Sequence, residues 1–149
     1  MDAPAPPEAA GCCGSARACV FARALHARTA SCTLASRRSL GEREVLECAA
    51  PVARLNCSTL AALLHERARF ALKLPAPGHP MVHAQALRLH CGGLEALREA
   101  MQAGHADVHA LVLAVHERHG SLTALPWEAI VRRLLQWAPR RRGGPPRAR

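Results

Sequence analysis

The chain has few aromatic residues and no tyrosine at all. Its aromatic side chains are limited to Phe21, Phe70, Trp127 and Trp137, although 50% of its 149 residues are hydrophobic. The core must therefore be built mainly from alanine, leucine and valine. Because that mixture favours helices over sheets, we expect a mostly helical protein.

The sequence also lacks a long apolar run. Its longest stretch, Ala110 to Val115, is far shorter than the roughly 18 residues that a membrane-spanning helix needs. The first residues are acidic and proline-rich, without the basic segment and apolar core of a secretory signal. We therefore expect a cytoplasmic protein with no membrane partner. The alternative is organelle targeting, because arginines but no acids lie between Glu8 and Glu42, as in transit peptides.

Acidic residues are absent from the C-terminal segment. Residues 132–149 hold seven arginines and no acid, whereas residues 1–131 hold 13 basic and 11 acidic groups, a net charge of only +2. An alternative function is therefore a helical module that binds nucleic acid or another partner nonspecifically through its basic C-terminus. Its candidate contacts are Arg132, Arg133, Arg140, Arg141 and Arg142. The other interpretation is a solvated terminus with a codon-biased arginine content.

Hydrophobic spacing and turn residues predict one small globular domain over residues 15–138, of the α or α+β class. The flanking segments 1–14 and 139–149 are rich in proline and glycine, and we expect them to be disordered. The expected helices are 16–27, 58–72, 94–103, 107–119 and 126–137, with a small β-hairpin of arms 32–38 and 44–48 around Gly41. Residues 82–91 fit a strand or a helix, and Gly92-Gly93 is expected to end that segment.

The seven cysteines are an odd number in a chain without a secretory signal, which argues against disulfide bonds. Loops, hairpin ends and helix N-termini can turn thiols toward one point, as a metal site requires. The hairpin would place Cys32 beside Cys48, the next helix would begin near Cys57, and Cys19 would approach from the first helix. Cys19, Cys32, Cys48 and Cys57 are therefore the predicted ligands, with Cys91 as a fifth candidate.

The spacing of these cysteines gives no independent support, since the chain contains no CxxC motif. Inert core thiols remain the competing interpretation, because free cysteine is among the most buried residue types. If metal is bound, irregular spacing favours an iron-sulfur cluster somewhat over zinc, whose compact sites usually show paired knuckles. The predicted function is a small metalloprotein with an accessory, electron-transfer or structural role and an unidentified protein or redox partner.

No catalytic group emerges from the sequence. The pair His90-Cys91 would need a base that reaches the thiol and a third orienting group, and neither can be named. The triplets that begin at His65 and His116 lack the second histidine of the HExxH zinc-protease motif. We therefore assign no catalytic residue, and an enzyme is the less favoured class.

Overall fold

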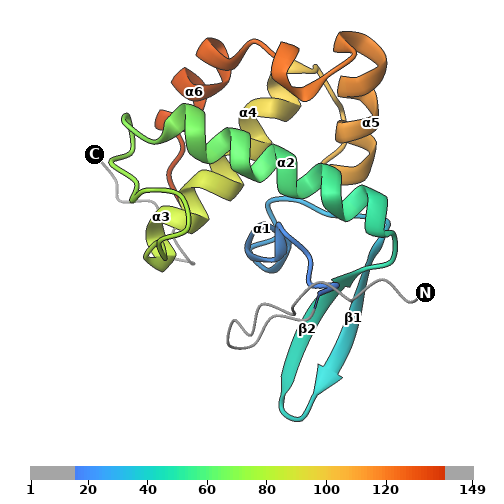
Figure 1. Ribbon diagram of the computed structural model, residues 1–149. Coiled ribbons are helices and arrows are strands. Elements are labelled where there is room, and N and C mark those ends of the chain that lie inside the picture. The colour runs from blue at the N-terminus through green and yellow to red at the C-terminus, as the bar shows by residue number, and fades with distance from the viewer. Residues whose placement is uncertain (1–15, 140–149) are drawn as a thin grey trace, which may run out of the picture.

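The computed structural model describes residues 16–139, which form helices and one antiparallel hairpin (Figure 1). In chain order the elements are α1 (Ala22–His26), β1 (Ala35–Leu40), β2 (Arg43–Cys48), α2 (Pro51–Ala68), α3 (His83–Leu87), a π-helical turn (Arg88–Gly92), α4 (Gly93–Ala100), α5 (Val108–His119), a 3-10 turn (Leu122–Ala124) and α6 (Trp127–Leu135). The expectation of a small, mostly helical α+β fold is confirmed. The segment 1–14 and all but the first residue of 139–149, which we predicted to be disordered, lie outside the described residues.

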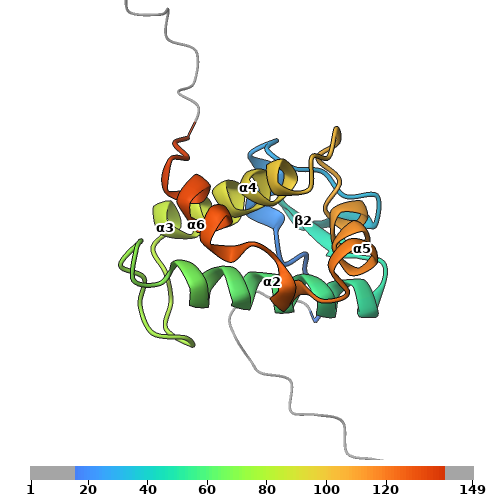
Figure 2. The ribbon, with the colours of Figure 1, turned by 90° about the horizontal axis from the view of Figure 1, so that it is seen from above.

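The helices enclose a core that is rich in leucine, and the hairpin extends from one end of this helical body (Figure 1). Seen from above, α2 and α4 run on opposite sides of the molecule (Figure 2). Phe21 is the one phenylalanine buried among the described residues, whereas Phe70 is exposed. No helix within residues 16–139 combines the length and the apolar character needed to cross a membrane.

The first helix is shorter than expected because the residues before it pair with the hairpin. Ala18 forms an antiparallel bridge with Glu47, and the Cys19 amide donates to the Leu46 carbonyl. Extended backbone cannot also be helical, so α1 starts only at Ala22. The expected hairpin is confirmed, with strands that begin at Ala35 and end at Cys48 and a turn at Gly41, whose φ of 62° suits glycine.

Helix α2 begins a full two turns before the expected start. Pro51 occupies its first position, where the missing amide proton costs no hydrogen bond. Ser58, the first residue of the expected helix, lies well inside the observed one. Cys57 is therefore in the second turn of α2 rather than at its N-terminus.

Gly92-Gly93 does not end a segment, which corrects the prediction from sequence. Helix α3 continues through the π-helical turn directly into α4. A Cβ on Gly93 would lie 2.8 Å from both Cδ atoms of Leu64 on α2, and one on Gly92 would lie 3.0 Å from the Cβ of Trp137. The two glycines thus permit close packing between helices rather than a turn.

Helix α5 has the ends that the sequence indicated. The Asp107 carboxylate accepts the Ala110 amide at 3.2 Å, and Gly120 follows the helix with a φ of 76°. Asp107 also accepts the Thr33 amide at 3.1 Å, and Ser31 exchanges backbone hydrogen bonds with Ala106 and Val108. The loop before the hairpin is therefore fastened to the start of α5.

Candidate metal centre

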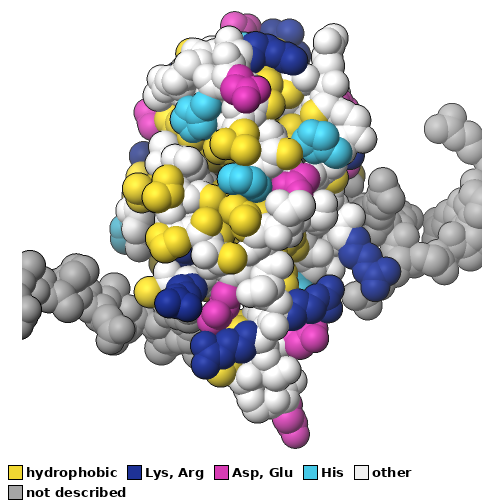
Figure 3. All heavy atoms as spheres, turned by 90° about the vertical axis from the view of Figure 1, so that its right-hand side faces the viewer, with side chains coloured by type: hydrophobic (Ala, Val, Ile, Leu, Met, Phe, Trp, Pro, Cys, Tyr) yellow, Lys and Arg dark blue, Asp and Glu magenta, His cyan; other side chains and the backbone are white. Residues whose placement is uncertain are grey.

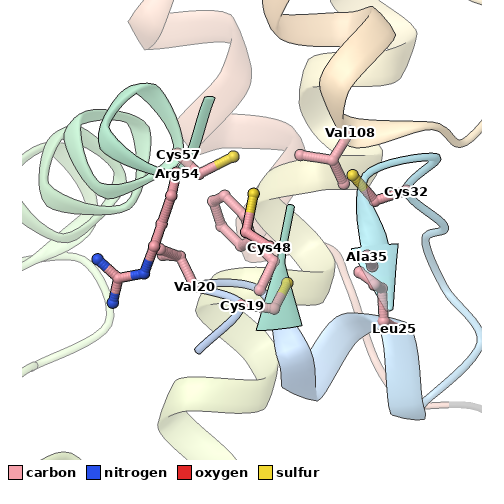
Figure 4. A pocket seen from close by; sticks show the side chains of 10 residues that line it. Cys19, Val20, Leu25, Cys32, Ala35, Cys48, Arg54, Cys57 and Val108 are labelled. Atoms are coloured by element: carbon pink, nitrogen blue, oxygen red, sulfur yellow. The ribbon is translucent and has the colours of Figure 1, made fainter. Parts of the chain in front are cut away.

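Four cysteines from four separate segments line one cavity of about 20 Å³ (Figure 4). They are the four predicted ligands, Cys19, Cys32, Cys48 and Cys57. In the close view the sulfurs of Cys57 and Cys32 point into the same space from opposite sides, and those of Cys48 and Cys19 lie between them. The volume is about that of one water molecule.

The positions of Cys19 and Cys48 follow from one backbone ladder. The Cys19 amide donates to the Leu46 carbonyl at 2.8 Å, and the Cys48 amide donates to the Arg17 carbonyl at 2.7 Å. In this register the two cysteines are diagonal neighbours, and diagonal neighbours lie on the same face of a ladder. Pairing across the ladder thus brings two thiols from distant parts of the sequence to one wall of the cavity.

Cys32 lies in the loop that is fastened to α5, rather than in a strand as the sequence suggested. Its neighbours on both sides are held, Ser31 by the backbone of Ala106 and Val108 and Thr33 by the Asp107 carboxylate. The Cys32 carbonyl accepts the Ala35 amide at 3.2 Å, which closes a turn into β1. Because Ala35 is the register partner of Cys48, this turn sets Cys32 beside the ladder.

Cys57 reaches the cavity from α2. Arg54, one helical turn earlier, lines the cavity with its side-chain stem. The guanidinium itself points away from the four sulfurs (Figure 4). The sequence reasoning did not single out Arg54, although its spacing of three residues from Cys57 was a usable signal.

The thiols are electrostatically coupled. Burial, with smaller contributions from the nearby Cys32, Cys19 and Cys48, raises the pKa of Cys57 from its ordinary value of 9.0 to about 12. Burial also raises the pKa of Cys19, against the effect of the Phe21 backbone hydrogen bond, which lowers it. Gathering thiolates here without a cation is therefore unfavourable, since like charges in a half-buried site repel.

The sulfurs surround the cavity without clustering tightly. Among residues 16–139, no group of three or more histidine, cysteine, aspartate or glutamate side chains is arranged so that it could hold a metal ion. The Cys48 thiol donates a hydrogen bond to the Ala50 carbonyl at 3.3 Å. Val20, Leu25 and Val108 complete a largely apolar wall.

Cys91, the fifth candidate, lies apart from this group. It belongs to the π-helical turn, has no exposed surface and packs in the core, with the Thr29 side chain as its hydrogen-bond partner. The imidazole of the preceding residue, His90, contacts the Phe21 ring edge-to-face, with 5.2 Å between the ring centroids. Cys91 thus fits the description of an inert core thiol.

Of the five arginines that are candidate contacts for the alternative, nucleic-acid-binding function, only Arg132 and Arg133 lie within the described residues. On α6 the Arg132 guanidinium lies 3.1 Å from the Glu128 carboxylate, and Arg133 lies 2.8 Å from that of Glu99. The remaining candidates, Arg140, Arg141 and Arg142, are outside the described residues. On the face in Figure 3, lysine and arginine side chains gather instead over the hairpin end, and apolar and histidine side chains cover much of the helical end.

Comparison of the chain with protein-family models, with curated proteins and with solved structures found no match.

Proposed function

We propose that this chain is a small metalloprotein whose metal centre is held by Cys19, Cys32, Cys48 and Cys57. The observation that carries the proposal is the shared cavity, which four thiols reach from four separate segments. An inert thiol needs only apolar neighbours, and Cys91 shows that pattern by packing into the core apart from the other cysteines.

The electrostatics of the cavity support a cation there. Burial, and after it each of the three neighbouring cysteines, raises the pKa of the Cys57 thiol. A bound metal reverses that effect, because thiolates are its ligands and its positive charge offsets their repulsion. The four side chains are only partly buried, so that a metal can enter from solvent.

Of the two candidate groups we favour an iron-sulfur cluster over zinc, because the four cysteines are irregularly spaced in the sequence, without the paired knuckles usual in compact zinc sites. A single zinc ion bonds each thiolate at about 2.3 Å and so draws four sulfurs into close contact. In this structure the sulfurs line a cavity, and no group of three or more described ligand-type side chains is already arranged to hold a metal ion. A cluster of several irons spreads its cysteines over a larger core than one zinc ion does, so the cavity of about 20 Å³ would have to widen to admit it.

Such a cluster supplies one-electron transfer or a structural cross-link, and this chain contributes the ligands and the surroundings. Val20, Leu25 and Val108 limit contact with water, and the Phe21 amide provides a hydrogen bond to the Cys19 sulfur. Hydrogen bonds to sulfur and solvent exposure are the levers by which a protein adjusts a cluster's potential. We assign no catalytic residue.

The test is anaerobic purification of the full chain, followed by visible absorption and analysis of iron, sulfide and zinc. We expect a brown protein with iron and sulfide in stoichiometric amounts. Cys57→Ser should strongly reduce the iron content of the purified protein. Cys91→Ala, the matched control, should leave the iron content unchanged. Zinc without iron would show that the centre is a zinc site rather than an iron-sulfur cluster. A folded, metal-free protein that also takes up no added metal would reject the centre altogether.

A further inference from the structure

One arginine connects the segments that carry three of the four sulfurs. The Arg54 Nε donates to the Ala18 carbonyl at 2.8 Å, across 36 positions of sequence. Arg54 lies one helical turn before Cys57 on α2, and Ala18 directly precedes Cys19. Because the Cys19 segment also pairs with β2, this hydrogen bond fastens the ladder that holds Cys19 and Cys48 to the helix that holds Cys57.

The Ala18 carbonyl is available for this bond because of the ladder register. The hydrogen bonds to β2 are made by the residues on either side, Arg17 and Cys19. In an antiparallel ladder the residue between two such bonds directs its own amide and carbonyl away from the partner strand. Ala18 therefore presents its carbonyl on the outer edge, where a third strand would otherwise pair. The Arg54 side chain takes the place of that strand.

We propose that Arg54 is the positioning residue of this site: its hydrogen bond to Ala18 sets the distance between Cys19 on the ladder and Cys57 on α2. This inference rests on the proposed function, since it concerns the same four thiols. Groups that orient metal ligands from outside the ligand set typically contribute 10- to 100-fold to metal affinity.

Two properties of Arg54 must be separated, namely its hydrogen bond and its charge. The charge lies within electrostatic reach, because Arg54 lowers the pKa of Cys19 and Cys57. In both cases, however, it is the smallest of the causes, and the guanidinium points away from the sulfurs (Figure 4). The geometry therefore favours the hydrogen bond as the main contribution.

Glutamine and lysine separate these two properties at position 54. The glutamine amide nitrogen occupies the same place along the side chain as the arginine Nε, so Arg54→Gln keeps a donor and removes the charge. Lysine has a methylene at that place, so Arg54→Lys keeps the charge and removes the donor from its position. Arg54→Met removes both. The control is Arg37→Met, which alters an exposed ion pair with Glu44 on the hairpin.

The experiment is titration of the metal-free, reduced full chain with Cd²⁺, followed by thiolate-to-cadmium absorbance and by ¹¹³Cd NMR, whose shift reports the number of sulfurs bound. We expect Arg54→Met to bind Cd²⁺ about 10- to 100-fold more weakly than the parent chain, with a changed ¹¹³Cd shift. Arg54→Gln should stay within a few-fold of the parent chain and keep its shift, and Arg54→Lys should resemble Arg54→Met. Circular dichroism establishes that each variant is folded, and the Gln and Lys variants decide the question if Arg54→Met does not fold.

Two results would overturn the inference about Arg54 alone. One is full affinity in Arg54→Met, and the other is rescue by lysine but not by glutamine, which would assign the effect to charge. A parent chain that binds no Cd²⁺ through thiolates and also carries no iron or zinc after anaerobic purification would instead reject the proposed function itself.

Discussion

His90 offers a test of the core that is independent of any metal. His90 is only 8% exposed, and its Nδ1 atom has no hydrogen-bond partner among the described residues. Burial, with a smaller contribution from the Arg23 charge, lowers the pKa of His90 from 6.5 to about 4. The imidazole is therefore neutral in the folded protein near pH 7, and acid should destabilise the fold through it.

The direction and size of the effect follow from proton linkage. Below pH 6.5 the unfolded chain protonates this histidine, whereas the folded chain stays neutral until the pH approaches 4. Stability is thus present above pH 6.5 and declines as the pH falls to about 4. The two pKa values imply a loss of about 3 kcal/mol over the whole window, of which about 2 kcal/mol is lost by pH 5.

The assay is urea unfolding of the parent chain and of His90→Leu at pH 7.5 and pH 5. Leucine has a similar volume, fits beside Phe21 and cannot be protonated. Acidification should cost the parent chain about 2 kcal/mol more than the variant, because all other titrating groups are common to both. An equal loss in the two proteins would refute the conclusion that His90 is buried in its neutral form.

Three further predictions concern the cysteine cavity and the close packing of the helices. Cd²⁺ binding should release at least the two protons of Cys19 and Cys57, whose pKa values are raised, so the affinity for Cd²⁺ should increase by about 100-fold or more per pH unit near neutrality. Calorimetry in two buffers of different ionisation enthalpy checks this, and release of fewer than two protons would contradict it. Gly93→Ala should destabilise the fold by about 1 kcal/mol, because overpacking against Leu64 costs more than the gain in helix propensity, whereas Gly104→Ala, where an added Cβ meets nothing within 4 Å, should be neutral or slightly stabilising in urea unfolding. Asp107→Ala should cost about 1 to 2 kcal/mol, since it removes the cap of α5 and the acceptor for Thr33, and Asp107→Asn should recover most of that loss; equal unfolding midpoints for the two variants would show that the cap contributes nothing.

Local signals in the sequence were sufficient where the structure is decided locally. Asp107 and Gly120 mark the ends of α5 because a capping carboxylate and a left-handed glycine act within one turn. The hairpin was predictable for the same reason, with Gly41 at its turn. Pro51 is an equally local signal for the start of α2, but the apolar spacing further along the helix placed the expected start at residue 58 instead.

The prediction failed where distant residues decide the outcome. A glycine pair usually signals a break, yet Gly92 and Gly93 lie inside a helix because Trp137 and Leu64 approach them closely. The start of α1 likewise depends on Ala18 pairing with Glu47, which no local pattern announces. Non-local contacts of this kind also create the cavity, since the ladder register and the loop fastened to α5 determine which thiols meet.

The location of the four cysteines gives them a structural consequence whatever their chemistry. A two-stranded hairpin is marginally stable on its own, and nearly all of β1 is exposed to solvent. The cysteines lie at the base of this hairpin, where it meets α2 and the loop before β1. A metal bound to all four would tie these segments together at the base of the hairpin, beside the core residues Phe21 and Val108 that also line the cavity. Because metal-binding free energy adds to folding free energy when the unfolded chain has no formed site, the hairpin end should gain more stability from metal than the helical body does.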